Sequence, residues 1–310
     1  MSALPSPPRF AVCLAAFNGR AYLQEQIDSI LNQKNVWLQL YISVDTSLDG
    51  TESFLADWAA REPRLSILPV GQRFGGAGPN FYRLLRDVDF RSVDYLSFAD
   101  QDDVWHADKL WRAHVAVHQQ CAAAYSSNVR AFWPDGRTLL IDKAQAQKKW
   151  DFLFEAAGPG CTYVLRRDVA LGLKNLIKTR WTEVQAVALH DWLAYAYVRT
   201  QGLKWLIDPV ATMDYRQHAG NQVGVNAGWR AFRHRVRKVL NGWAPQQAAL
   251  IASLLGMDEQ LFVQRWKGRG RMGLLWLALN ASQCRRRLRD QFLFALSVLA
   301  LALLGRRPQK

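Results

Sequence analysis

The 310-residue sequence contains few cysteines, and they are widely separated. The four are Cys13, Cys121, Cys161 and Cys284, with no C-x-x-C pair and no histidine at zinc-finger spacing. This spacing predicts neither a structural zinc module nor a disulfide framework. We therefore expect reduced thiols, as in an intracellular protein.

The sequence also lacks a secretory signal and a long apolar run. Residues 1–9 contain two adjacent prolines and no apolar core behind a basic segment, which argues against export. Residues 292–304 form an uncharged run of 13, short of the roughly 20 residues that a membrane-spanning helix needs. We expect a cytoplasmic protein in which this run lies on a membrane or dips into it without crossing.

Acidic residues are scarce in only one part of the chain. Residues 1–228 hold 24 Lys and Arg against 23 Asp and Glu, a net charge of +1, whereas residues 229–310 hold 16 against 3, a net charge of +13. Half of all residues are hydrophobic and 12% are aromatic, which is typical of a globular protein and excludes a disordered or fibrous one. We predict a nearly neutral domain, residues 1–228, followed by a basic extension, residues 229–310.

Short apolar runs and amphipathic stretches alternate over residues 10–120. This alternation predicts an α/β fold with a mostly parallel central sheet covered by helices. The expected strands are residues 10–16, 37–44, 65–69 and 93–99. The expected helices are residues 23–31, 51–60 and 80–88.

Three polar residues, Asn18, Asp45 and Asp100, each lie just after one of these strands. The carboxyl ends of parallel strands meet along one edge of an open sheet, where ligands bind. We therefore expect a binding site at that edge.

The second half of the domain has a less regular pattern. A Pro-Asp-Gly turn within residues 132–137 indicates a hairpin. Residues 161–165 are strand-like, and residues 189–198 carry the apolar stripe of a helix. We expect this half to form a mixed layer added to the first.

The string Asp100-Gln101-Asp102-Asp103 places three carboxylates in four positions after an apolar strand. Such charges repel one another, and a hard divalent cation that bridges carboxylates and phosphates removes the conflict. The alternative is a solvated acidic loop or a helix start, in which Asp103 caps a helix running through Leu110. We assign Asp103 to that alternative, and Asp100 and Asp102 to ligand binding.

Several further motifs follow one another in order along the chain. They are Ala16-Phe17-Asn18-Gly19, Ser43 to Thr51, Gly75-Gly76 with Asn80-Phe81, Asp100-Gln101-Asp102, His190-Asp191-Trp192, and Tyr215-Arg216-Gln217-His218 with Asn221. Over about residues 10–225 this series resembles inverting glycosyltransferase family 2, of the GT-A fold, and in detail its rhamnosyltransferase-like branch. Two departures are Val44, where the family often has the first Asp of a pair, and Thr46, where it often has Gly.

The resemblance implies how the site is divided. It makes residues 10–120 a nucleotide-binding half and residues 121–228 an acceptor half. It makes Asp102, together with His218, a ligand of Mg²⁺ or Mn²⁺, and it assigns recognition of the base to Asp45, for which a turn carboxylate bonding local amides is the alternative. The implied nucleotide-sugar contacts are Ala16, Phe17, Asn18, Asp45, Gly75, Gly76, Asn80, Asp100 and Gln101. Asp49 we expect to cap the helix that begins near Thr51.

Asp191 matches the family's late acidic residue, the catalytic base. A positioned carboxylate that takes the proton of an acceptor hydroxyl accelerates attack by about 10²- to 10⁴-fold. The alternative is an ordinary acidic residue at a helix start, favoured there by the helix dipole. Placed in the motif series, Asp191 is predicted to be the base of a single displacement that inverts the anomeric carbon.

Other residues near these motifs have weaker assignments. Arg216 is a predicted phosphate contact, because a guanidinium neutralises phosphate charge. Trp105 and Trp192 flank the acidic motifs and are candidates to stack on a sugar ring, with core packing as the alternative in a chain that has 13 tryptophans.

The basic extension combines arginines with apolar residues. Residues 229–243 contain five basic residues and no acid, and basic residues also flank residues 292–304. A basic amphipathic helix suits an anionic membrane surface, which favours a peripheral place on the inner face of the cytoplasmic membrane. The alternative is a C-terminal helix docked on its own domain. No nucleic-acid-binding motif accompanies the charge, so we expect no nucleic-acid partner.

The sequence thus predicts a metal-dependent glycosyltransferase whose partners are a nucleotide-diphosphate sugar and a glycan or lipid-linked acceptor. Enzymes of the branch it resembles commonly build surface polysaccharide or lipopolysaccharide. One rival is a non-catalytic sugar-nucleotide or glycan-binding module using the same cleft. Another is a membrane-surface or nucleic-acid-binding protein that acts through its basic tail.

Overall fold

A computed structural model describes residues 6–218 and 241–304, and the chain divides into two compact units. The sheet unit comprises Met1–Ala144 and Ala157–Ala219, and the helical unit comprises Gln145–Ala156 and Gly220–Lys310. A short segment from the middle of the chain therefore belongs to the helical unit, which lies otherwise at the C-terminal end.

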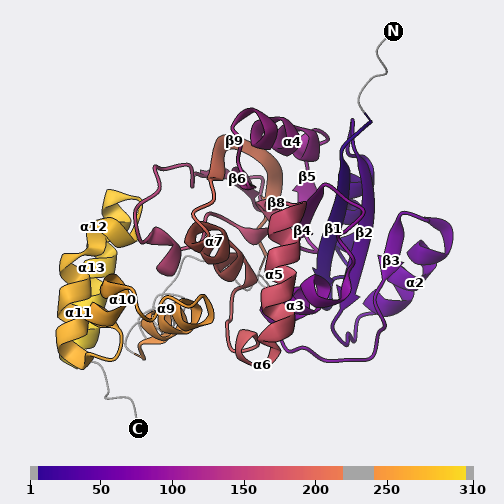
Figure 1. The fold of residues 1–310 in the computed structure, drawn as a ribbon. Coiled ribbons are helices and arrows are strands. Elements are labelled where there is room, and N and C mark those ends of the chain that lie inside the picture. Colours follow the sequence, from indigo (N-terminus) through magenta and orange to yellow (C-terminus); the bar gives the residue numbers. More distant parts are fainter. Residues whose placement is uncertain (1–5, 219–240, 305–310) are drawn as a thin grey trace. The chain divides into compact units, whose positions relative to one another are not determined.

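Four parallel strands form one half of the sheet, in the order β3-β2-β1-β4 (Figure 1). They are β1 (Arg9–Ala16), β2 (Trp37–Val44), β3 (Leu65–Ile67) and β4 (Tyr95–Ala99). The inner strands are apolar along nearly their whole length because helices cover both faces of a parallel sheet. All four predicted strands are confirmed, with β3 and β4 each two residues shorter than expected.

The connecting helices also lie where the apolar periodicity placed them. They are α1 (Leu23–Leu31), α2 (Thr51–Arg61) and α3 (Ala77–Asp87). Helix α3 begins three residues before its predicted start at Asn80, because Pro79 occupies its first turn, where a missing amide hydrogen costs nothing. Asp49 accepts a hydrogen bond from the backbone of Thr51, the first residue of α2, at 3.0 Å, but the N-cap residue of this helix is Gly50 and not Asp49.

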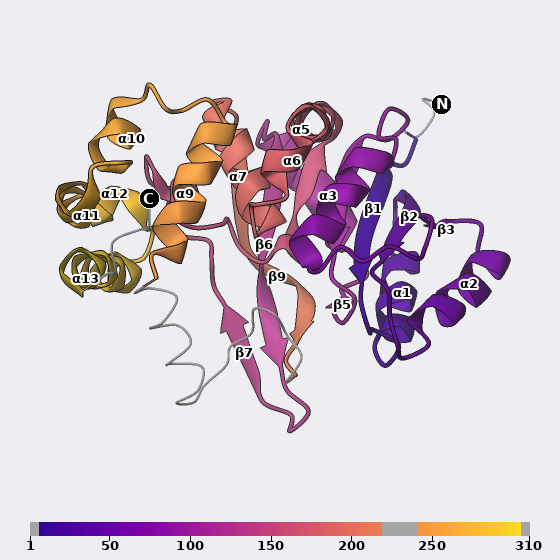
Figure 2. The same cartoon turned by 90° about the horizontal axis from the view of Figure 1, so that it is seen from below.

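The second half of the domain continues the same sheet instead of adding a separate layer. After β4 the strand order is β8 (Val164–Arg166), β6 (Ala124–Phe132), β9 (Trp205–Arg216) and β5 (Val104–Trp105). Among the described residues of this second half, β6 and β9 pair in parallel and the other pairs are antiparallel. Strand β7 (Thr138–Ile141) pairs with β6 across the Pro-Asp-Gly turn, so the predicted hairpin is confirmed (Figure 2). A 3₁₀ turn, η2 (Gly160–Thr162), occupies the start of the strand expected over residues 161–165.

Four further helices belong to the sheet unit. They are α4 (Lys109–Gln119), α5 (Arg167–Thr179), α6 (Trp181–Val184) and α7 (His190–Thr200). Helix α7 confirms the helix expected over residues 189–198. It begins at the His-Asp-Trp motif, so Asp191 lies in its first turn.

The helical unit contains five described helices. They are α9 (Trp243–Leu254), α10 (Leu261–Trp266), α11 (Gly270–Leu279), α12 (Ala281–Cys284) and α13 (Leu288–Leu304). Among the described residues no helix has both the length and the apolar character needed to cross a membrane. The amphipathic helix expected over residues 229–243 falls almost entirely outside the described residues.

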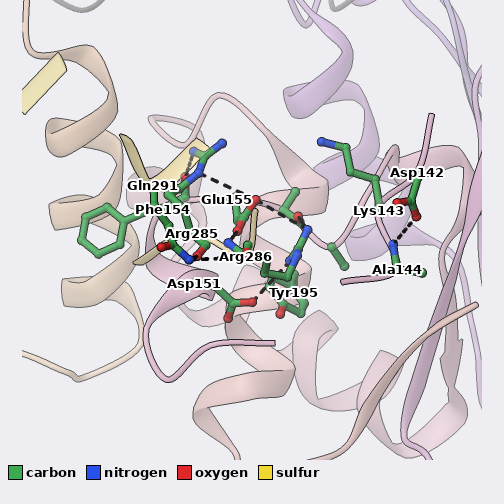
Figure 3. Close-up of polar contacts among 12 residues, drawn as sticks. Asp142, Lys143, Ala144, Asp151, Phe154, Glu155, Tyr195, Arg285, Arg286 and Gln291 are labelled. Atoms are coloured by element: carbon green, nitrogen blue, oxygen red, sulfur yellow. Dashed lines mark hydrogen bonds and ion pairs between the residues drawn. The ribbon is translucent and has the colours of Figure 1, made fainter. Parts of the chain in front are cut away.

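The segment 145–156, which includes the 3₁₀ turn η1 (Asp151–Leu153), is built into the core of the helical unit. The side chain of Arg286 is 1% exposed. Its guanidinium lies 3.4 Å from the carboxylate of Asp151 and 3.6 Å from that of Glu155 (Figure 3). The ring of Trp150 stacks on that of Phe262 with centroids 4.5 Å apart. Residues 241–304 therefore pack around a segment that the sequence placed in the catalytic domain.

Candidate active site

The turn after β1 is tied to the acidic string by one side chain. Gln101 accepts a hydrogen bond from the amide of Phe17 at 2.7 Å and donates one to the carbonyl of Phe17 at 3.0 Å. A Cβ on Gly19 would lie 2.4 Å from Oε1 of Gln101, so a larger residue there would displace the Gln101 side chain. Gln101 thus joins the turn after β1 to the acidic string at the sheet edge.

Asp45 holds the loop that carries the paired glycines. Its two carboxylate oxygens accept hydrogen bonds from the amides of Phe74, at 2.7 Å, and Gly75, at 2.9 Å. Gly75 has a φ of +80°, a conformation that favours glycine. These partners are about 30 residues away, so Asp45, which is 3% exposed, does more than close its own turn.

The predicted nucleotide contacts fall into two groups. Phe17, Asn18 and Gly75 are exposed at the sheet edge. Asn80 is buried and donates to the carbonyls of Ser43, at 3.1 Å, and Ala16, at 3.4 Å. Asn80 therefore links the ends of β1 and β2 and shapes the site from beneath.

The structure contradicts the helix-capping role predicted for Asp103. Helix α4 begins only at Lys109, after the two-residue strand β5, so Asp103 is too far from the helix to cap it. Asp103 is instead 1% exposed and accepts the backbone amide of Arg216 at 3.3 Å. Burial, followed by the neighbouring carboxylates Asp100 and Asp102, raises the pKa of Asp103 well above its usual range.

Asp102 is paired with the segment that closes the sheet unit. Nε2 of His218 lies 2.7 Å from Oδ2 of Asp102, and the imidazole stacks on Tyr22 with centroids 4.7 Å apart. Nε of Arg216 donates to the carbonyl of Asp102 at 3.0 Å, and the same guanidinium pairs with Glu25. The structure thus brings His218 and Arg216 to the acidic string, as the motif series predicted.

The donor set fits a hard divalent cation. Asp100, Asp103 and Cys161 each offer a ligand atom within 4.8 Å of the others. Burial raises the pKa of Asp100 to about 7, with Asp102 and Asp191 as further causes, so the carboxylates repel one another and a cation would relieve this repulsion. Burial also raises the pKa of the Cys161 thiol, so within this group the carboxylate oxygens are the donors that suit Mg²⁺ or Mn²⁺. Asp102 and His218, the ligands that the motif series predicted, are not members of this group.

Asp191 is the acidic group on the other side of this cluster. Burial raises its pKa to about 6, while the amides of Trp192 and Gly160 and the charge of Lys143 act in the opposite direction. The amide of Trp192 donates to Oδ1 at 2.7 Å. A partly desolvated carboxylate with this pKa is ionised near neutral pH and basic enough to accept a proton.

The neighbours of Asp191 fix its position. His190 is buried, its ring stacks on Phe81 with centroids 3.8 Å apart, and burial lowers its pKa to about 3, so it is a neutral packing group. A Cβ on Gly160 would lie 2.9 Å from both Asp191 Cβ and His190 Nε2. Neither Gly160 nor Lys143 is among the residues that the sequence predicts for the site.

The two tryptophans proposed to stack on a sugar are core residues. Trp105 is 3% exposed and Trp192 is 4% exposed, so neither ring offers a face to a ligand. Nζ of Lys109 lies 3.3 Å from the ring centre of Trp105 and covers it. Packing, the alternative, is correct for both.

Known proteins resemble this chain in sequence and in fold. The model of the family described as Glycosyl transferase family 2 matches residues 11–170. A Shigella flexneri protein, dTDP-rhamnosyl transferase RfbG, is 41% identical over 287 residues, which cover 92% of this chain and 99% of the relative.

Solved structures share the fold at low sequence identity. Staphylococcus aureus TarS 1–349, in complex with UDP-GlcNAc, is 11% identical, with a TM-score of 0.54 over 95% of this chain and 88% of the other. The mannosyltransferase PcManGT from Pyrobaculum calidifontis, in complex with GDP-Man and Mn²⁺, is 17% identical, with a TM-score of 0.53 over 97% and 89%. These likenesses concern the arrangement of the chain.

Proposed function

The chain belongs to glycosyltransferase family 2, and on that basis we propose that it moves a sugar from a nucleoside-diphosphate donor to an acceptor hydroxyl, with Asp191 as general base. The observation that carries the proposal is the place of Asp191, in the first turn of α7 with its carboxylate held by the amide of Trp192 at 2.7 Å. Asp191 is also close enough to the acidic string to raise the pKa of Asp100, and burial raises the pKa of Asp191 itself to about 6. Asp191 and the acidic string lie in different environments. We assign the acid–base step to Asp191 and the binding of the metal to the acidic string.

The donor occupies the carboxyl edge of the parallel strands. Phe17, Asn18 and Gly75 are exposed there and offer backbone and side-chain contacts to a nucleotide, and Asp45 fixes the loop that carries Gly75. A relative 41% identical over nearly its whole length is described as a dTDP-rhamnosyl transferase, which supports rhamnose from a deoxythymidine diphosphate donor.

Asp102, together with His218 and Asp100, would hold the cation. A divalent cation bound there supplies positive charge that stabilises the departing diphosphate. Arg216 keeps the acidic string in place through its bond to the carbonyl of Asp102.

Asp191 accepts the proton of the acceptor hydroxyl as that oxygen attacks the anomeric carbon from the face opposite the diphosphate. The bond to the diphosphate breaks as the new glycosidic bond forms, so the configuration inverts. The amides of Gly160 and Trp192 hold the carboxylate in one orientation. Positioning of this kind removes the entropic cost of bringing base and hydroxyl together.

The acceptor we propose is a hydroxyl of a glycan or lipid-linked sugar in the assembly of surface polysaccharide or lipopolysaccharide. The support is the resemblance of the motif series to the rhamnosyltransferase-like branch, together with the basic, apolar character of residues 229–310.

A screen of nucleotide sugars tests the proposal. With Mg²⁺ or Mn²⁺ present, dTDP-rhamnose should raise the melting temperature of the purified protein more than other nucleotide sugars, because a ligand that binds only the folded state stabilises it. Slow release of dTDP from the bound donor should accompany this stabilisation. Stabilisation without release, even with glycan acceptors, would indicate a non-catalytic binding module.

A further inference from the structure

Helix α13 is apolar on both its packed and its solvent side. Val298 and Ala302, 3% and 1% exposed, lie on the packed side. The opposite side carries large apolar residues at helical spacing, and we call it the α13 apolar face. Its members are Leu288, Phe292, Leu293, Leu296, Leu303 and Leu304.

The exposure of this face is high for residues of this kind. Phe292 is 65% exposed, Leu296 is 48% exposed and Leu303 is 70% exposed. Helices that are apolar all round are normally buried. Single exposed leucines are ordinary, but a contiguous apolar strip along a 17-residue helix, about 25 Å long, marks an interaction surface.

Positive charge accompanies the α13 apolar face at its start. Arg287 precedes the helix, and Arg289 lies in its first turn with a side chain 77% exposed. The single acid of α13, Asp290, pairs with Arg289 at 3.4 Å.

Helix α11, which lies beside α13 (Figures 1 and 2), has the same character. Its exposed residues include Met272 and Leu279, and Arg269 and Arg271 stand at its start. Basic residues thus lie at the ends of a pair of helices whose exposed residues are otherwise largely apolar. A partner with an apolar interior and a negatively charged surface complements this pattern.

We propose that the α13 apolar face docks on an anionic lipid bilayer, with the helix lying in the interface. A helix in this position buries its apolar side chains at the boundary of head groups and acyl chains, while its arginines reach anionic head groups. The sequence carries further positive charge outside the described residues, because residues 229–240 hold five basic residues and residues 305–310, which follow α13 in the chain, hold three, without any acid. A second copy of the chain is the competing occupant, and it would meet the same arginines with like charge.

Membrane docking does not depend on the proposed sugar transfer. It can be measured without donor or acceptor, so failure of one proposal leaves the other standing. If both hold, the bilayer brings the enzyme to lipid-linked acceptors.

Flotation of the full-length protein with vesicles tests the proposal. Wild type should float with vesicles of phosphatidylcholine and phosphatidylglycerol, and far less with phosphatidylcholine alone, and 0.5 M NaCl should weaken binding. The double variant Phe292→Glu with Leu296→Glu should lower the partition coefficient more than about tenfold. Arg287→Gln with Arg289→Gln should lower it about fivefold for each arginine, on anionic vesicles only.

Matched variants in the sheet unit control for added or removed charge. Leu139 and Leu140 on β7 are 50% and 56% exposed, so Leu139→Glu with Leu140→Glu adds the same charge to an equally exposed apolar pair and should leave flotation unchanged. The control for the arginine variant is Arg91→Gln with Arg137→Gln, whose side chains are 80% and 70% exposed. It removes the same charge and should leave flotation unchanged.

Three outcomes would overturn the proposal. In the first, wild type does not float with anionic vesicles. In the second, the Phe292→Glu, Leu296→Glu variant floats as well as wild type while keeping the wild-type melting temperature. In the third, wild type is a dimer that this variant dissociates, which assigns the face to a second copy.

Discussion

Nε2 of His218 lies 2.7 Å from Oδ2 of Asp102, which joins two residues 116 positions apart in the sequence. The imidazole also stacks on Tyr22, from the segment before α1. The acidic string, the segment before α1 and the segment that follows the last strand of the sheet unit therefore meet. We propose that the pair provides an oxygen and a nitrogen donor for the same cation.

Metal binding should depend on this pair. Mn²⁺ should raise the melting temperature of wild type, and His218→Ala should weaken its apparent affinity about tenfold by removing one donor. Thermal shift against Mn²⁺ concentration measures this without any sugar. His118→Ala, an exposed histidine on α4, is the control. Identical titrations for wild type and His218→Ala would remove His218 from the metal site.

Transfer should follow the ionisation of Asp191. Burial raises the pKa of this carboxyl to about 6, so it is protonated and inactive as a base below that pH and ionised above it. The value of kcat/KM should therefore rise through about pH 6 and level off above pH 7. A profile that is flat from pH 5 to pH 8 would contradict the assignment.

Gly160→Ala should damage catalysis with little effect on donor binding. The new Cβ would stand 2.9 Å from Asp191 Cβ and from His190 Nε2, which forces the base away from its position. A displacement of about 1 Å can cost on the order of 100-fold in rate. Gly158→Ala is a matched control, because its Cβ would meet its nearest neighbour at 3.6 Å, an ordinary contact. Equal kcat values for the two variants would show that Gly160 does not position Asp191.

Arg286→Met should destabilise the helical unit. The substitution removes the buried arginine that pairs with Asp151 and one of the two arginines that pair with Glu155, and breaking a buried ionic cluster costs about 3–5 kcal/mol. Urea denaturation followed by tryptophan fluorescence measures the loss. Arg289→Met removes an arginine that is 77% exposed and should change the free energy of unfolding by less than about 1 kcal/mol. Equal losses for the two variants would mean that the buried cluster contributes nothing.

The sequence was sufficient to predict the parallel half of the sheet and the polar residues at its edge. Both depend on local signals, namely apolar runs of strand length and polar residues directly after them. Asn18, Asp45 and Asp100 accordingly lie at strand ends, as expected. The Pro-Asp-Gly turn and helix α7 have similarly local causes.

The errors concern features set by distant partners. The sequence around Asp103 resembles the start of a helix. In the structure β5 separates Asp103 from the next helix, and its carboxylate accepts the amide of Arg216. The buried carboxylates of Asp151 and Glu155 pair with arginines about 130 positions later in the chain, Arg286 for both and Arg285 for Glu155. Gly160 shows its importance only where its backbone approaches Asp191. Periodicity carries no information on such pairs.

The most direct test of the account is the rate of sugar transfer by Asp191→Asn, measured together with the dissociation constant of its donor. Asparagine keeps the volume of the side chain and an oxygen for the amide of Trp192, but it cannot take a proton. We expect transfer to fall by about 10²- to 10⁴-fold while the donor dissociation constant stays within about twofold of wild type. Transfer at the wild-type rate by this variant would contradict the central claim that Asp191 is the catalytic base.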